Sequence, residues 1–213
     1  MKAVSSTGCS PADQVNGSAA RLLARALVIR LNRPAMLVLV VGPSGVGKDT
    51  LMNRARVLLA GRSDIVFVKR EITRPTTGDA EQHIPIEEDA FTRRQADGAY
   101  ALSWRANGLG YGVRTEIESH LAAGAIVVLN TSREIVASAR QRFGRVRIIS
   151  IVADPATIAE RLKQRGRESA PDMARRLERA SRPDLSGDDV VVLRNEGGVE
   201  EGAQRLAELI AAE

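Results

Sequence analysis

Short apolar runs alternate with segments of mixed polarity from Met36 to the end of the chain. The apolar runs predict strands at residues 37–41, 65–68, 100–104, 125–129, 146–152 and 190–193. The segments between them predict helices at residues 50–59, 87–95, 114–122, 132–142, 155–164, 172–180 and 199–211. Continuous apolar strands are typical of a parallel sheet that is buried on both faces. Their alternation with helices therefore predicts an α/β fold, in which helices cover both faces of a parallel sheet.

Two polar or glycine-rich stretches separate these elements. Residues 71–82 predict a polar loop, and residues 108–112 predict a turn after the strand at 100–104. These boundaries group residues 36–213 into one domain, preceded by an extension at residues 1–35.

The extension has a composition of its own. Residues 5–18 are small and polar and resemble a disordered tail, whereas residues 19–31 could form a short amphipathic helix that carries arginines. A targeting peptide, a non-native start upstream of Met36 and a plain tail all agree with this composition. The sequence does not choose among them, so the segment is expected to be disordered or partly helical.

Composition narrows the class of protein. A hydrophobic fraction of 44% in 213 residues is enough for one core. The single cysteine, Cys9, cannot form an internal disulfide, which suits a cytoplasmic protein. No apolar run approaches the roughly 18 residues that a membrane helix needs, so no membrane partner is expected. The net charge is +5, but basic and acidic residues are mixed without an aromatic platform, so no nucleic-acid partner is expected either. A homodimer remains open.

The most informative motif follows the first predicted strand. Seven residues match the pattern G-x-x-x-x-G-K: Gly42, Pro43, Ser44, Gly45, Val46, Gly47 and Lys48. The motif lies between a buried strand and a helix, which is the context that a phosphate-binding loop requires. Its backbone N–H groups, the lysine ammonium and the helix N-terminus would together surround a phosphate chain. The loop therefore predicts that a nucleoside triphosphate binds here, with Lys48 between its β- and γ-phosphates.

The residue after the lysine departs from the usual pattern, which has Ser or Thr at that position. Here it is Asp49, followed by Thr50. Either residue could be the metal ligand, because carboxylate and hydroxyl oxygens both suit Mg²⁺. Asp49 could instead be an ordinary first-turn helix residue, favoured by the helix dipole.

Together with three further segments, this loop resembles the guanylate kinase family. The segments are Ile72-Thr73-Arg74-Pro75, Gly110-Tyr111-Gly112, and Arg161 to Gly166 followed by Ala174 to Leu177. The resemblance implies a P-loop NTPase fold with ATP and Mg²⁺ as cofactors, an acceptor-binding subdomain at about residues 70–112 and a lid at about residues 165–176. It also implies that Lys48, Arg165 and Arg176 act in catalysis. Arg74 and Tyr111 would hold the acceptor phosphate, and Asn195 would touch the nucleotide. Arg161 also matches a lid arginine, although a solvent-facing role is the alternative.

Four departures concern the residues that would read guanine or hold its phosphate. A second acceptor-loop arginine is missing at residues 76–78, and Gln82 replaces a tyrosine. Leu102 stands where a guanine-reading glutamate is expected, and Asn130 stands where the strand at 125–129 should end in an acidic residue. A site that loses the partners of a base loses discrimination for that base.

With Asp49 and the segment around Trp104, these departures are similar to the branch of the family that phosphorylates ribose 1,5-bisphosphate. That resemblance implies ATP-dependent formation of 5-phosphoribosyl 1-diphosphate and ADP in phosphonate catabolism, with a small-molecule sugar bisphosphate as substrate. Guanylate kinase activity and a non-catalytic binding module are the alternatives. His83 lies in the acceptor loop, where it either contacts the sugar phosphate or has a plain surface role. Trp104 and Tyr100 are expected to be packing residues rather than stacking platforms.

Overall fold

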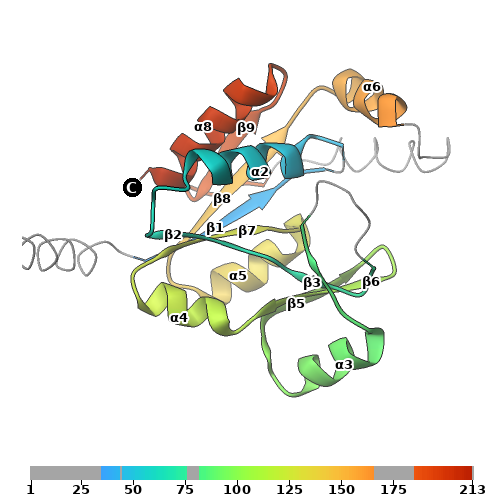
Figure 1. The fold of residues 1–213 in the computed structure, drawn as a ribbon, viewed down its shortest axis with the longest axis vertical. Coiled ribbons are helices and arrows are strands. Elements are labelled where there is room, and N and C mark those ends of the chain that lie inside the picture. Colours follow the sequence, from blue (N-terminus) through green and yellow to red (C-terminus); the bar gives the residue numbers. More distant parts are fainter. Residues whose placement is uncertain (1–34, 44, 76–81, 166–184, 213) are drawn as a thin grey trace, which may run out of the picture. The chain divides into compact units, whose positions relative to one another are not determined.

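A computed structural model describes residues 35–43, 45–75, 82–165 and 185–212 of the chain (Figure 1). These residues belong to one compact unit, Ala35–Glu213. The predictions for residues 1–34, for Ser44 and for the helix at 172–180 therefore lie outside the described residues, and the domain boundary at residue 36 remains a prediction. Within the described ranges, no helix has the length and apolar character needed to cross a membrane.

The central layer is a parallel sheet of five strands in the order β2-β7-β1-β8-β9. Its strands are β1 (Met36–Val41), β2 (Ile65–Val68), β7 (Ile126–Asn130), β8 (Val146–Val152) and β9 (Val190–Arg194). All six residues of β1 are buried, as its unbroken apolar run predicts. The predicted parallel sheet is confirmed.

Helices cover both faces of this sheet, as Figure 1 shows. Val38 and Val40 of β1 pack with α2 (Lys48–Leu58) and α8 (Val199–Ala211). Leu37 and Leu39 face the opposite side, where the core includes residues of α4 (Glu116–Ala122), η1 (Arg133–Ile135) and α5 (Val136–Arg142). The alternation of side chains along one strand thus supplies two cores. A further helix, α6 (Pro155–Arg165), follows β8.

A second, smaller sheet has the strand order β4-β3-β6-β5. It consists of β3 (Glu71–Ile72), β4 (Ile84–Pro85), β5 (Tyr100–Ala106) and β6 (Leu109–Arg114), and α3 (Glu88–Ala96) lies beside it. The prediction of a polar loop over residues 71–82 is wrong at its start, because Glu71 and Ile72 are buried and pair with β6. Glu71 is a charged residue buried in a strand, and a charged residue in the sequence predicts a loop rather than a buried strand.

The predicted turn over residues 108–112 is also wrong. The turn consists of Asn107 and Gly108, which have φ values of 52° and 76° and connect the paired residues Ala106 and Leu109. Asn-Gly in a two-residue connection is the common hairpin sequence, because both positions need a positive φ. The glycines that follow lie inside β6, where they make room for a neighbouring element.

Those strand glycines lie on the face of β6 that packs against aromatic rings. A Cβ on Gly110 would come within 2.8 Å of the Phe91 ring of α3, and a Cβ on Gly112 would overlap the ring of Tyr100. The two rings pack on each other with centroids 5.2 Å apart. The pattern Gly-Tyr-Gly therefore places Tyr111 on one face of the strand and leaves the other face open for these rings.

We expect Gly112→Ala to lower the free energy of unfolding by about 1–3 kcal/mol, because the added methyl group overpacks the Tyr100 ring. Gly61→Ala is the matched control, since a Cβ at Gly61 meets nothing within 4 Å. Chemical denaturation of both variants measures the difference. Equal stability of the two variants would contradict the packing role given to Gly112.

Candidate nucleotide and acceptor site

The glycine-rich loop connects the end of β1 to the start of α2. Gly42, Gly45 and Gly47 have φ values of 155°, 87° and 92°. A Cβ on Gly42 would lie 2.5 Å from the backbone oxygen of Ile151, and a Cβ on Gly47 would lie 2.6 Å from Nδ2 of Asn195. Both conformation and space therefore require glycine at Gly42 and Gly47. Lys48 is the first residue of α2, so its N–H group belongs to the helix N-terminus.

Two side chains from later parts of the chain donate hydrogen bonds to this loop. Asn195, which follows β9 and is 5% exposed, donates from Nδ2 to the backbone oxygen of Val46 at 2.7 Å. Arg161 of α6 donates from Nη1 to the same oxygen at 3.3 Å. The structure thus brings Arg161 to the phosphate loop, rather than leaving it on a solvent-facing surface.

A cavity of about 240 Å³ opens beside the loop. Its lining residues are Gly45, Gly47, Thr50, Leu51, Arg161, Asn195, Gly197 and Val199. A larger cavity of about 580 Å³ shares Asn195 and Gly197 with it and extends along β9 and α8 to Arg194 and Arg205. The smaller cavity is the better candidate for the nucleotide, because the glycine loop itself forms one wall.

The two departures at Asp49 and Asn130 meet at this loop. Asn130 is the last residue of β7 and pairs in register with Val40 of β1, shortly before the loop begins. Its Nδ2 donates a hydrogen bond to Oδ1 of Asp49 in the first turn of α2. Sequence reasoning identified each residue as unusual but could not show that they touch, since they are 81 positions apart.

No group of three or more His, Cys, Asp or Glu residues that could hold a metal occurs among the described residues. Mg²⁺ in kinases is commonly bound by one or two carboxylates together with substrate phosphates and water. Asp49 and Thr50 flank the loop where such phosphates would lie, and Thr50 lines the smaller cavity. The residues present therefore fit a metal that binds together with the nucleotide.

On the acceptor side, backbone contacts hold the segment that contains Arg74. Thr73 Oγ1 accepts a hydrogen bond from the Gly110 N–H at 2.8 Å, and the Arg74 N–H donates to Ile72 at 2.7 Å. His83 Nε2 lies 3.1 Å from the Arg74 carbonyl oxygen. A carbonyl can only accept, so this nitrogen must carry the hydrogen. His83 is 7% exposed, so the alternative of a plain surface role is wrong.

Tyr111 lies in a stack with a tryptophan and an arginine. The rings of Trp104 and Tyr111 are parallel within 7°, with centroids 5.1 Å apart. The Arg70 guanidinium carbon lies 5.5 Å from the Tyr111 centroid and 5.9 Å from that of Trp104, and Arg70 is only 8% exposed. Tyr111 thus contacts both the Trp104 ring and the Arg70 guanidinium, which also contacts Trp104. Arg70 was missed by sequence reasoning, because an arginine between two predicted elements carries no motif.

Leu102, at the position where a guanine-reading glutamate is expected, is a buried core residue. Leu102 is 4% exposed and belongs to the same core cluster as Trp104 and Val113. The expectation that Trp104 is a packing residue agrees with this cluster. Gln82, the other substituted position, accepts a hydrogen bond from Arg56 of α2 at 2.7 Å.

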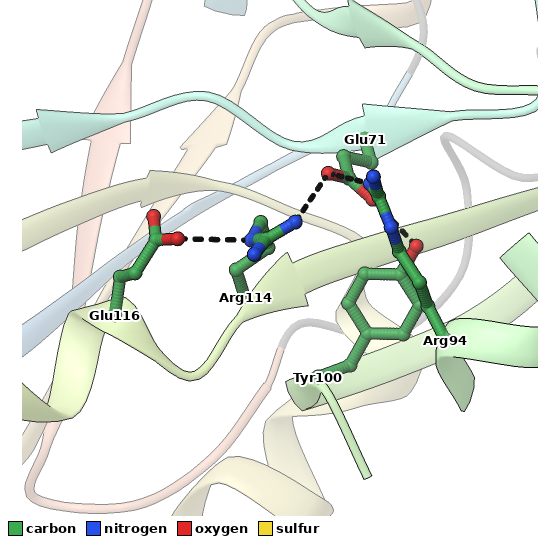
Figure 2. A network of polar contacts seen from close by, with 5 residues as sticks. All are labelled: Glu71, Arg94, Tyr100, Arg114 and Glu116. Atoms are coloured by element: carbon green, nitrogen blue, oxygen red, sulfur yellow. Dashed lines mark hydrogen bonds and ion pairs between the residues drawn. The ribbon is translucent and has the colours of Figure 1, made fainter. Parts of the chain in front are cut away.

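Behind the acceptor segment, a buried carboxylate ties the small sheet to α3 (Figure 2). Glu71 is 3% exposed and accepts hydrogen bonds from Tyr100 Oη at 2.6 Å and Arg94 at 2.5 Å, with Arg114 at 3.5 Å. Burial alone would raise the pKa of Glu71, but the hydrogen bonds from Tyr100 and Arg94 and the charge of Arg94 outweigh it, so the pKa is lowered. Burial and the neighbouring carboxylate raise the pKa of Tyr100 to about 12. The network fixes β3 immediately before Arg74.

The lowered pKa of Glu71 predicts acid sensitivity. A carboxylate with a depressed pKa stabilises the fold above its ordinary value of 4.5, and this contribution is lost as the pH falls through the folded-state pKa. Glu71→Gln should therefore be less stable than the parent at neutral pH by about 1–3 kcal/mol, with the two curves converging in acid. Urea denaturation across this pH range measures the effect.

The control for that prediction is Glu118→Gln, since Glu118 forms an exposed ion pair with Arg142. We expect it to change stability by about 0–1 kcal/mol at any pH. A Glu71→Gln deficit that persisted unchanged into acid would show that the loss is steric rather than electrostatic.

Some predicted site residues cannot be placed. Ser44, residues 76–81 and Arg176 lie outside the described residues, and Arg165 is described only as the last residue of α6. The catalytic roles of Arg165 and Arg176 and the lid at about 165–176 therefore stay predictions.

The family model and the similar proteins indicate the same family for this chain. Residues 34–213 match the model of the guanylate kinase family. A protein named ribose 1,5-bisphosphate phosphokinase PhnN from Agrobacterium fabrum is 39% identical over 174 residues, covering 82% of this chain and 95% of the relative. Proteins of the same name from Acidiphilium cryptum and Methylobacterium radiotolerans are 50% and 44% identical, covering 75% and 81% of this chain and 84% and 96% of the relatives.

A solved guanylate kinase from Anaplasma phagocytophilum matches the fold with a TM-score of 0.60, over 84% of this chain and 86% of that chain. At 19% identity this likeness concerns the fold alone. Family model, relatives and fold agree with the strand–loop–helix site described above. The chain belongs to the guanylate kinase family and, within it, to the group of relatives named ribose 1,5-bisphosphate phosphokinase.

Proposed function

We propose that this protein transfers the γ-phosphoryl group of ATP to ribose 1,5-bisphosphate, which yields 5-phosphoribosyl 1-diphosphate and ADP in phosphonate catabolism. One observation carries the choice of acceptor. The two positions where guanine readers are expected are both engaged within the protein, since Leu102 is packed in the core and Asn130 is bonded to Asp49. The names of the similar proteins support the same acceptor.

The donor side follows from the glycine loop. Its backbone N–H groups and the N-terminus of α2 would surround the phosphates of ATP, and Lys48 would bridge the β- and γ-phosphates. Asn195 and Arg161 hold the Val46 end of the loop through hydrogen bonds to the Val46 carbonyl oxygen, which would help to position that part of the cradle for the nucleotide. Mg²⁺ bound with ATP would supply charge neutralisation on the phosphates, with Asp49 or Thr50 as its protein ligand.

The acceptor side needs little proton chemistry. An oxygen of the sugar 1-phosphate, already ionised at neutral pH, attacks the γ-phosphorus as the bond from that phosphorus to the bridging oxygen of ADP breaks. No general base is required, so catalysis consists of alignment and charge neutralisation. Arg74 and Tyr111 would hold the acceptor, and His83 fixes the Arg74 backbone. Arg165 and Arg176 would neutralise the transferring group, as the family resemblance implies.

The wider setting is also a proposal. A single cysteine suits the reducing cytoplasm, where ATP and sugar phosphates are available. Whether two copies associate is a separate question, which gel filtration answers.

An ADP-release assay with two alternative acceptors tests the proposal. We expect turnover with ribose 1,5-bisphosphate and little or none with GMP. Turnover of GMP alone would instead establish a guanylate kinase. Titration calorimetry with ATP and Mg²⁺ addresses the non-catalytic alternative, which the absence of any nucleotide binding would favour.

A further inference from the structure

The contact between Asp49 and Asn130 connects two departures from the family pattern that are far apart in the sequence. The register of β1 and β7 pairs Asn130 with Val40, and the Thr131 N–H donates to the Val40 carbonyl at 3.0 Å, which extends the pairing past the strand end. The backbone of Asn130 is thereby fixed beside the glycine loop. From there its side-chain amide reaches the carboxylate of Asp49.

The chemistry of the two side chains explains why an amide suits position 130 beside Asp49. The NH₂ group of Asn130 donates a hydrogen bond to the Asp49 carboxylate. A second carboxylate at this position would have no hydrogen to donate and would repel the first.

A second observation indicates what the pair faces. Oδ1 of Asn130 and Oγ1 of the neighbouring Thr131 are buried, and neither has a hydrogen-bond partner within the described part of the chain. Thr131 itself is 3% exposed. Buried polar oxygens are rarely left without partners, so these acceptors point to water or another donor that arrives with the ligand. Waters bound to Mg²⁺ are donors of this kind.

We infer that Asn130 is a positioning residue that orients the Asp49 carboxylate toward the metal that accompanies the nucleotide. The inference rests on the proposed use of a metal–nucleotide donor, but it does not depend on which acceptor is phosphorylated.

The first test measures ATP binding by titration calorimetry, with and without Mg²⁺ and with no acceptor present. Asn130→Ala should weaken the Mg²⁺-dependent part of ATP binding by about 10–100-fold, the usual effect of removing a group that orients a metal ligand. Binding of ATP without Mg²⁺ should not change, and the melting temperature should shift by about 2–4 °C or less. Ser132→Ala is the matched control, because the Ser132 hydroxyl at the same strand end accepts a local hydrogen bond from the Glu134 N–H.

The decisive test is a double-mutant cycle on the two residues. Asp49→Ala and Asn130→Ala should each weaken the Mg²⁺-dependent part of ATP binding. The double variant Asp49→Ala/Asn130→Ala should weaken it little more than Asp49→Ala alone, because Asn130 acts through Asp49.

The outcomes separate this inference from the proposed function. If the effects of the two single substitutions simply added in the double variant, the inference would be overturned, since independent sites add. Equal losses of ATP binding with and without Mg²⁺ in Asn130→Ala would show a purely structural role and overturn it as well. Failure of the proposed function would appear instead in the acceptor assay, or as absent nucleotide binding by the parent protein.

Discussion

Lys48→Ala is expected to lower turnover by about a thousandfold or more while leaving the fold intact. Removing one preorganised group that stabilises transition-state charge typically costs rate on this scale. Lys48 begins α2 directly after Gly47, so its ammonium accompanies the helix N-terminus at the point where the phosphates would lie. Substitution by alanine, a good helix former, keeps the backbone of α2. Steady-state kinetics with saturating acceptor, together with a melting curve, measures both effects.

Lys69→Ala is the control for that experiment. Lys69 is exposed just after β2, and its substitution removes the same charge from the protein. We expect near-parental turnover from it. Near-parental turnover of the Lys48 variant as well would remove the glycine loop from the mechanism, since the lysine is the one ionic group that the loop itself supplies.

Arg74→Ala is expected to lower kcat/KM for ribose 1,5-bisphosphate by about 10- to 100-fold, the cost of losing hydrogen bonds to a charged group. The KM for ATP should change little. The segment is held by its own backbone contacts to Ile72 and His83, so the loss should come from the guanidinium and not from unfolding. Arg74→Lys should recover only part of the loss, because an ammonium cannot bind phosphate in bidentate fashion. Initial rates at varied acceptor and varied ATP separate the two KM values.

Arg93→Ala supplies the matched control, since Arg93 is an exposed arginine in the last turn of α3. It should leave both KM values near those of the parent. If Arg74→Ala raised the KM for ATP instead of the KM for the acceptor, the assignment of the small sheet to acceptor binding would be contradicted.

The parallel sheet and the glycine loop were predictable because each depends on local pattern. The unbroken apolar run of β1 can only be buried on both faces, and the loop has glycine where Gly42 and Gly47 leave no room for a Cβ. Both were predictable because the residues that define each of them are neighbours in the chain. The roles of Arg74 and Tyr111, which the family resemblance implies, stay predictions.

The errors arose where a residue type served an unusual purpose. The polarity of Glu71 predicted a loop. Glu71 is instead buried in a strand, where Arg94 and Tyr100 donate hydrogen bonds to its carboxylate. Gly110 and Gly112 suggested a turn, although they lie in a strand and accept the rings packed by α3. Glycine signals a turn through φ, but it also marks close approach of another group, and the sequence alone does not distinguish the two.

Contacts between residues that are far apart in the chain could not be predicted from the sequence. The hydrogen bond from Asn130 to Asp49 depends on the register of β1 with β7, and the approach of Arg161 to Val46 depends on how α6 leaves β8. The contacts of Arg70 with Tyr111 and Trp104 likewise bring the residue before β3 to the strands β5 and β6. A sequence motif identifies residues one at a time, whereas the chemistry of the site depends on contacts between residues that are far apart in the sequence.

The most direct measurement of the central claim follows the transferred group itself. With ATP labelled by ¹⁸O in its γ-phosphoryl group and ribose 1,5-bisphosphate as acceptor, phosphorus NMR and mass spectrometry of the product report where the label arrives. We predict 5-phosphoribosyl 1-diphosphate with the label in its terminal phosphate. Label found only in inorganic phosphate, or transferred only when GMP is the acceptor, would contradict the account.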